Sequence, residues 1–292
     1  MIIDIHTHCG VLDVHYNDRF FEEMYSPFGI PLPFRMPPGR EVDLLVQGMD
    51  EAGIDKSVLL ACDEELTLNV KQTSEYVAEQ VKRYPDRLIG FAGVDPMKGK
   101  EALMEFEWAI KDLGLKGLKI LPTYQHYAPN DERVFPFYEK AQELDVPVLI
   151  HQAWTPVVDA PMKYQHPYLL DDVAIKFRDL RIIIAHFGFP WTDECMFLLA
   201  KHKNLFTDLS ALSWFPPEYL AQVLSRAKQM FPRVLPDKIL LGTEGADQKN
   251  IVNTIKNINL VIERMGLTKL TKEDIEKILG KNAQRLLRLY KI

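Results

Sequence analysis

Residues 131–151 read DERVFPFYEKAQELDVPVLIH and contain the unit that decides the fold. The first part, 131–144, is an amphipathic segment of helical length, and the last part, 146–151, is an apolar run that ends in a histidine. A run that is apolar at nearly every position is typical of a strand buried on both faces, as in a parallel sheet. The stretch therefore predicts a helix followed by a buried strand.

The same unit recurs along the whole chain. Short apolar runs predict eight strands, at 2–6, 55–61, 87–93, 115–121, 146–151, 181–186, 204–209 and 238–243. Amphipathic segments predict helices between them, among them 41–53, 73–85, 100–114, 131–144, 217–230 and 250–266. Eight strand–helix units match a (β/α)8 TIM barrel, for which about 250 residues is typical. Because no linker divides the 292 residues, we predict an α/β fold with a single TIM-barrel domain over residues 1–292.

Two segments depart from this alternation. Residues 9–40 follow the first strand, contain five prolines and mix aromatic residues with Arg19, Arg35 and Arg40. We expect this long loop to cover the barrel mouth as a lid and substrate wall; a surface excursion without a ligand role is the alternative. Residues 271–290 predict extra C-terminal helices, with Thr271 as an N-cap.

Composition narrows the expected partners. The formal charge of −6 and a pI near 5.8, without a cluster of basic residues, argue against nucleic acid and anionic membranes. No apolar run approaches the roughly 18 residues that span a bilayer, and the opening lacks the features of a secretory signal. Three widely spaced cysteines, Cys9, Cys62 and Cys195, argue against a disulfide framework and fit a reducing compartment. We expect a cytoplasmic protein that binds a small molecule.

Polar residues occupy the ends of the predicted strands, where TIM barrels place their active sites. His6 and His8 end the first strand, and side chains two residues apart in a strand share one face. The later strand ends supply Lys119, His151, His186, Asp208 and Glu244. Burying four imidazoles in one place costs desolvation free energy unless they bind a common ligand such as a metal ion, so we predict a metal site.

Ligand chemistry narrows the choice of metal. Three imidazoles and one carboxylate suit zinc, with manganese, iron or cobalt as alternatives, and leave a position open for water. Such a metal lowers the pKa of bound water toward about 7. The fourth histidine would serve as an acid–base group, because its unperturbed pKa lies near neutrality. These considerations alone leave open which histidine that is.

Six motifs, taken together, resemble the amidohydrolase superfamily. They are IDIHTH, GLKILPTYQHYAPND, PVLIHQAWTP, IIIAHFG, LLGTEG and ILGKNAQRLL. More narrowly, they resemble the branch related to aminocarboxymuconate semialdehyde decarboxylase, over nearly the whole chain. The resemblance implies one divalent metal, usually zinc or manganese, bound by His6, His8, His151 and a carboxylate on strand eight, with His186 as the acid–base catalyst. It also implies decarboxylation, hydration or lactone hydrolysis as the activity, and a homodimer as one possible assembly.

One motif departs from the branch, which usually has Gly-Thr-Asp where this sequence has Gly242-Thr243-Glu244. We expect Glu244 either to bind the metal or to accept a proton from its water. Asp247 is the substitute ligand if Glu244 does not coordinate. Asp4 shares the predicted strand face of His6 and His8, so we expect it to project into the barrel core. There we expect it to support the metal ligands indirectly and not to bind the metal itself.

Three residues are candidates for substrate binding, namely Lys119, Trp154 and Arg40. Lys119 could bind a substrate carboxylate; an outward-facing charge and a metal-bridging carbamate are the alternatives. Trp154 follows His151 and could form a wall of the pocket or pack in the core.

We predict a metal-dependent hydrolase that acts on a small carboxylated or cyclic substrate with metal-activated water. In that reaction Glu244 takes the proton of the water and His186 protonates the leaving group. The alternative is a non-oxidative decarboxylase of an aromatic or muconate-like acid. Histidinol-phosphatase-like enzymes fit less well, because they rely on a histidine near the C-terminal end and none follows His202.

Overall fold

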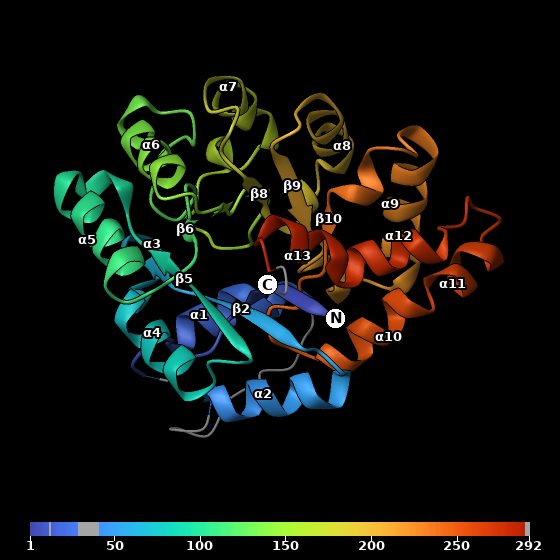
Figure 1. Cartoon of the computed structure of the whole chain (residues 1–292), viewed down its shortest axis with the longest axis horizontal. Coiled ribbons are helices and arrows are strands. Elements are labelled where there is room, and N and C mark those ends of the chain that lie inside the picture. Colours follow the sequence, from blue (N-terminus) through green and yellow to red (C-terminus); the bar gives the residue numbers. More distant parts are fainter. Residues whose placement is uncertain (12, 29–40, 290–292) are drawn as a thin grey trace.

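Eight parallel strands form the predicted barrel in a computed structural model that describes residues 1–11, 13–28 and 41–289 (Figure 1). In order around the barrel they are β1 (Ile3–Thr7), β2 (Lys56–Leu60), β5 (Leu88–Gly93), β6 (Leu118–Ile120), β7 (Val148–Ile150), β8 (Ile182–Ile184), β9 (Leu205–Asp208) and β10 (Ile239–Leu240). The prediction of a TIM barrel is confirmed. Their parallel pairing explains the apolar runs, since both faces of nearly every strand are buried.

Helices surround the strands in the order of the sequence, as Figure 1 shows. The outer helices are α2 (Glu41–Ala52), α4 (Ser74–Arg83), α5 (Lys100–Lys111), α6 (Phe135–Glu143), α7 (Leu170–Lys176), α8 (Thr192–Lys201), α9 (Pro217–Met230), α10 (Gln248–Lys256) and α11 (Ile258–Arg264). The helix predicted over 250–266 is therefore two helices. They are separated at Asn257, whose backbone leaves the helical region (φ −106°, ψ 11°).

Two core clusters fill the barrel and its outer layer. The interior cluster takes alternate strand residues, including Ile3, Ile5, Val58, Leu60, Phe91, Leu149, Ile183 and Leu240. The other cluster lies between the strands and the helices, with Leu118, Ile150 and Val42 among its members. Apolar burial of this extent is the main force that holds the strands and helices together.

The barrel closes between its last and first strands, where β10 is only two residues long. Ile5 N donates to Leu241 O (2.9 Å), and Glu244 N donates to His6 O (2.9 Å). Thr7 and Glu244 form an isolated parallel bridge. The backbone of Glu244, a predicted metal ligand, is therefore part of the seam that closes the barrel.

The register of β1 is irregular between Asp4 and Thr7. We expected Asp4 to project into the barrel core, because strict alternation would place it on the face of His6. That expectation is wrong: Ile3 and Ile5, on either side of Asp4, pack in the interior cluster, so Asp4 points away from it. Its carboxylate accepts hydrogen bonds from Thr243 N (3.2 Å) and Thr243 Oγ1 (2.5 Å) instead. Asp4 thus supports the turn that carries Glu244.

Further elements extend both ends of the barrel. A hairpin of β3 (Cys62–Glu64) and β4 (Val70–Gln72), with α3 (Glu65–Leu68) between them, follows β2 and was not predicted. In the predicted lid, 9–40, the structure describes α1 (Asp18–Tyr25) and η1 (Ser26–Phe28), whereas residues 12 and 29–40 lie outside the described residues. After α12 (Lys272–Glu276), a π-helical turn (Lys277–Lys281) and α13 (Asn282–Leu286) pack against β1 and β10.

Short 3-10 turns occur in several connections. They are η2 (Pro96–Lys98), η3 (Glu132–Val134), η4 (Met162–Tyr164), η5 (Pro167–Leu169), η6 (Ala185–Gly188), η7 (Leu212–Trp214) and η8 (Leu235–Asp237). Thr271 is the N-cap of α12, as predicted, and forms a capping box with Asp274. Among the described residues, no helix combines the length and apolarity needed to cross a membrane.

Candidate metal centre and active site

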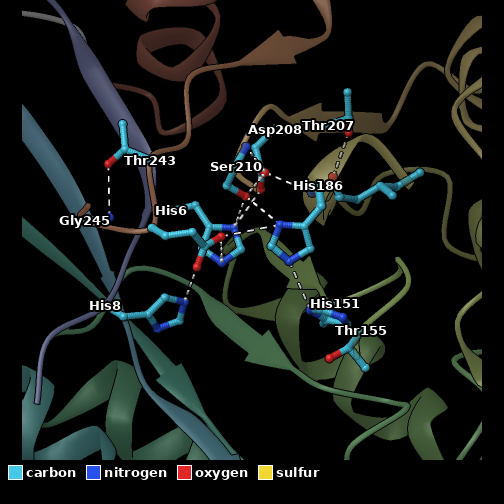
Figure 2. Close-up of polar contacts among 12 residues, drawn as sticks. His6, His8, His151, Thr155, His186, Thr207, Asp208, Ser210, Thr243 and Gly245 are labelled. Carbon is cyan, nitrogen blue, oxygen red and sulfur yellow. Dashed lines mark hydrogen bonds and ion pairs between the residues drawn. The ribbon is translucent and has the colours of Figure 1, made fainter. Parts of the chain in front are cut away.

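Four histidines that are distant in sequence meet at the carboxyl ends of the strands. His6 and His8 lie at the end of β1, His151 follows β7, and His186 lies in η6 after β8. The ring centroid of His6 lies 5.2 Å from that of His8 and 5.0 Å from that of His186. The ring centroids of His151 and His186 are 4.8 Å apart. Figure 2 shows His6 and His186 next to each other, with Asp208 and Ser210 on one side and His8 and His151 on the other.

Glu244 places its carboxylate among these rings. Glu244 Oε1 lies 3.5 Å from His6 Nε2 and 3.4 Å from His186 Nδ1, and Oε2 lies 3.4 Å from His8 Nε2. Two ligands bound tetrahedrally at about 2.1 Å from one ion are about 3.4 Å apart. Within the described structure, His151 Nε2 and Glu244 Oε1 are buried without a hydrogen-bond partner. This donor set and its spacing fit a divalent metal ion.

Asp208 orients the first of these histidines. Its Oδ2 lies 2.9 Å from His6 Nδ1, and its Oδ1 accepts hydrogen bonds from the backbone N–H groups of His186 and Ser210, both at 3.0 Å. With Nδ1 held in this way, His6 turns Nε2 toward the cavity. Burial alone would raise the pKa of Asp208, but the adjacent His6, His186 and Ser210 lower it to about 2. The carboxylate is therefore ionised across the physiological range.

His186 is held through both ring nitrogens. Its Nδ1 lies 2.8 Å from Ser210 Oγ, and its Nε2 lies 3.1 Å from His151 Nδ1. Its backbone is in the left-handed region (φ 58°), as are those of Phe187 (φ 51°) and Glu244 (φ 61°). Such conformations are unfavourable for residues other than glycine and cluster at functional sites. Burial lowers the pKa of His186 to about 4, so its ring is neutral at pH 7.

The structure also locates the candidates for substrate binding. Lys119 is buried (1% exposed), and its Nζ lies 3.3 Å from His6 Nε2, so it is not an outward-facing charge. Trp154 lines the same cavity as the histidines. Arg40 lies outside the described residues. Asp247, the predicted substitute ligand, also lines the cavity, where its Oδ2 accepts a hydrogen bond from Asn250 (3.2 Å).

These residues share a cavity of about 780 Å³ at the barrel mouth. Its inner end carries the histidines, Lys119 and Glu244. Its other walls are largely aromatic and include Tyr16, Phe20, Phe21, Tyr25, Trp154, Phe189, Trp214 and Phe215. Four of these, Tyr16, Phe20, Phe21 and Tyr25, come from the predicted lid segment. An apolar cavity with a few convergent polar groups is typical of a small-molecule site.

Sequence reasoning missed two polar residues of this site. Ser210 contacts His186 and also His6 (Oγ to Nδ1, 3.1 Å), and its place two residues after Asp208 was the available signal. Glu64 lines the cavity from the hairpin strand β3. It belongs to the acidic run CDEE, which is typical of an exposed turn, so its sequence context gave no such signal.

A TIM barrel with this constellation at its strand ends belongs to the class of metal-binding barrel enzymes. The chain itself belongs to the amidohydrolase family, whose sequence model matches residues 3–289. This membership confirms the resemblance found in the sequence motifs.

The chain is similar to a gamma-resorcylate decarboxylase of Polaromonas sp. (strain JS666 / ATCC BAA-500), at 28% identity over 185 residues. The match covers 50% of this chain and 55% of that protein, so the chain spans about half the length of this curated relative.

Many solved structures share the fold, and two of them illustrate the likeness. An uncharacterized TIM-barrel protein of Bordetella bronchiseptica has a TM-score of 0.75 and 22% identity, with 98% of each chain covered. A dihydroxybenzoic acid decarboxylase of Polaromonas sp. JS666, with bound manganese and the inhibitor 2-nitroresorcinol, has a TM-score of 0.64 and 21% identity; 100% of this chain and 98% of that chain are covered.

These relatives overturn one prediction made from the sequence. We expected hydrolysis, with decarboxylation as the alternative. The curated relative is a decarboxylase, and so is one of the two solved structures described with it. The prediction of a hydrolase is therefore wrong. Its physical basis was weak, because metal-binding histidines and an acid–base histidine serve both reactions equally well.

Proposed function

We propose that the chain is a metal-dependent decarboxylase that releases CO₂ from an aromatic acid without oxidation. One observation carries this proposal: His151 Nε2 and Glu244 Oε1, buried without hydrogen-bond partners among the described residues, lie in one cavity with His6, His8 and the buried Lys119. That cavity offers a cation site beside a second positive charge, which suits a carboxylate substrate. The decarboxylase activity of the curated relative supports the choice of reaction.

We assign His6, His8, His151 and Glu244 as the ligands of one divalent ion. His6 and His8 turn Nε2 toward the Glu244 carboxylate, and His151 Nε2 is buried without a hydrogen-bond partner among the described residues. His186 Nδ1 also lies 3.4 Å from Glu244 Oε1, but Ser210 Oγ contacts that nitrogen at 2.8 Å, so we assign His186 to proton transfer. The ion supplies a positive charge that holds the substrate carboxylate. Zn²⁺ suits this ligand set, and Mn²⁺ is bound in the Polaromonas dihydroxybenzoic acid decarboxylase, so both ions are candidates.

Lys119 and Trp154 bind the substrate in this proposal. The Lys119 ammonium group is buried beside His6 and attracts the substrate carboxylate through a charge-assisted hydrogen bond. Trp154 offers an aromatic face to the substrate ring. Arg40, which lies outside the described residues, is proposed from the sequence alone as a third substrate contact.

Decarboxylation exchanges a C–C bond for a C–H bond. The bond between the ring carbon and the carboxyl carbon breaks, the ring carbon takes a proton, and CO₂ leaves. We assign this proton transfer to the pair formed by Glu244 and His186, whose Oε1 and Nδ1 lie 3.4 Å apart. The pair delivers one proton to the ring carbon, and solvent returns one proton to the pair after CO₂ leaves. Ser210 and His151 fix the His186 ring, which keeps its orientation constant during the reaction.

The test is turnover of 2,6-dihydroxybenzoate by protein that has been stripped with a chelator and reloaded with Mn²⁺ or Zn²⁺. We expect equal amounts of CO₂ and 1,3-dihydroxybenzene, measured by gas analysis and chromatography. A panel of hydroxybenzoates that all remain intact with stoichiometric metal bound would refute the proposal.

His186→Asn tests the assigned roles. We expect it to retain the metal while the rate falls by about a hundredfold to ten-thousandfold, the usual effect of losing an acid–base group. Loss of the metal from this variant would make His186 a ligand instead of the proton carrier. His151→Asn is the matched comparison, and it should lose metal.

A further inference from the structure

Glu64 is a second carboxyl group in the cavity, and the proposed reaction does not use it. The residue is only 7% exposed and lines the cavity together with His8, Lys119 and Glu244. In the part of the chain that the structure describes, no hydrogen bond or ion pair reaches its carboxyl group. Unlike His151 Nε2 and Glu244 Oε1, which are fully enclosed without a hydrogen-bond partner, the Glu64 oxygens keep contact with the cavity space. The low exposure of the side chain limits their solvation there, so a hydrogen-bond donor on a bound ligand would stabilise the carboxyl group.

Asp63, the residue before Glu64 on the same strand, has the ion pairs that Glu64 lacks among the described residues. Asp63 and Glu64 are consecutive in β3, and consecutive strand residues point to opposite faces. The carboxylate of Asp63 forms ion pairs with Lys98 (2.7 Å) and Lys71 (3.2 Å). Glu64, on the cavity side, has no such pair. The hairpin thus neutralises one carboxyl group and leaves the other facing the ligand space.

The anchoring of the hairpin keeps Glu64 in place. Glu64 lies opposite Val70 in the antiparallel register of β3 and β4. Gln125 Nε2 donates hydrogen bonds to Asp63 O (2.9 Å) and Val94 O (3.1 Å), which ties the hairpin to the barrel. Burial raises the pKa of Glu64 to about 7, against the effect of the nearby Lys119.

We propose that Glu64 is a specificity-determining residue: it accepts a hydrogen bond from a hydroxyl group on the substrate ring and disfavours a second carboxylate, so it selects monoacids with a ring hydroxyl over diacids. This inference rests on the proposed function for the identity of the reaction. In this proposal the bound ion takes the substrate carboxylate, and Glu64, which lines the same cavity near Lys119, contacts a ring hydroxyl. A ring hydroxyl satisfies the buried carboxyl group, whereas a second carboxylate meets a like charge in a poorly solvated site.

The experiment measures binding, so that it does not depend on turnover. Calorimetry with Mn²⁺-loaded protein compares 2-nitroresorcinol, which has two hydroxyl groups, with 2-nitrophenol, which has one. The variants are Glu64→Met, which removes the acceptor at similar size, and Glu64→Gln, which removes only the charge. Glu51→Met is the matched control, because Glu51 is an exposed carboxylate at the edge of the same cavity.

We expect the unmodified protein and Glu51→Met to prefer 2-nitroresorcinol by about tenfold or more. This preference should shrink in Glu64→Gln and disappear in Glu64→Met. A second comparison uses 2-hydroxyisophthalate, a diacid, which should bind the Glu64→Met variant more tightly than the unmodified protein. Thermal unfolding without ligand gives a further readout, since replacing an unpartnered buried carboxyl group by an apolar side chain should raise the melting temperature.

The outcomes separate this inference from the proposed function. An unchanged preference in Glu64→Met, or no preference in the unmodified protein, would refute the role of Glu64 even if decarboxylation is observed. A preference that depends on Glu64 in a protein that decarboxylates none of the hydroxybenzoates would refute the proposed function and leave the role of Glu64 standing.

Discussion

Replacing Asp208 by asparagine tests how the protein fixes the orientation of His6, one of the proposed metal ligands. The Asp208 carboxylate accepts a hydrogen bond from His6 Nδ1 (2.9 Å) and from the backbone N–H groups of His186 and Ser210. An asparagine oxygen can still accept the two backbone hydrogen bonds, so we expect the fold to survive. Its amide group cannot accept a hydrogen bond from His6 Nδ1, so His6 is free to carry its proton on Nε2 instead.

The expected loss of metal affinity follows from the contact between Asp208 and His6 Nδ1. A proton on His6 Nε2 blocks the atom that faces Glu244 at 3.5 Å. Loss of the carboxylate that supports a ligating histidine typically weakens metal binding by about 10-fold to 100-fold, which corresponds to about 1.4 to 2.8 kcal/mol. We therefore expect the Kd of Asp208→Asn for Mn²⁺ or Zn²⁺ to rise by that factor.

The assay is a competition titration against a chromophoric chelator, run on both metals. Asp63→Asn is the matched control, because Asp63 is also a buried carboxylate (2% exposed) but pairs with Lys71 and Lys98, away from the histidines. A Kd of Asp208→Asn within twofold of the unmodified protein would refute the reasoning. So would an equal loss of affinity in Asp63→Asn, since the effect would then come from general destabilisation.

Three further results are expected. Asn282→Ala removes buried hydrogen bonds to Pro236 O (2.7 Å) and Ile239 O (2.9 Å), so the free energy of unfolding in urea should fall by about 2 to 3 kcal/mol; a change below about 0.5 kcal/mol would contradict this. Burial lowers the pKa values of His6 and His151, which keeps both rings neutral below the usual value of about 6.5. Metal should therefore remain bound at pH 6 in equilibrium dialysis and dissociate only as the pH falls further, whereas complete release at pH 6 would contradict the assignment. Removing the metal should destabilise the protein by about 2.7 kcal/mol relative to protein at an ion concentration 100 times its Kd, and identical melting curves for both forms would show that the ion does not bind the folded state.

The barrel was predictable because its strands carry a strong signal. β7 and β8 lie within the predicted runs 146–151 and 181–186, since strands buried on both faces must be apolar throughout. The β3 and β4 hairpin gives no such signal, because its strands are short, charged and paired with each other. The break at Asn257 was hidden for another reason: the apolar period continues through it from α10 into α11.

The site was predictable only where strand ends define it. His6, His151 and Glu244 follow apolar runs, so their meeting follows from the barrel itself. Asp4 does not share the face of His6 as predicted, because the register of β1 is irregular between Asp4 and Thr7, which no residue pattern reveals. Glu64 depends on a hairpin that turns one acidic residue inward and the next outward. The choice between hydrolysis and decarboxylation could not be made, since the same donor atoms serve both reactions.

The position of Glu244 at the barrel seam has a consequence for ring closure. His6 and His8 come from the end of β1, the first strand of the barrel, whereas Glu244 follows β10, the last. With the ligands proposed above, one ion would link the two strands between which the ring closes. Binding of the ion would then report that the ring is closed, and deuterium uptake at the Ile5 and Glu244 amides should slow when the ion is added.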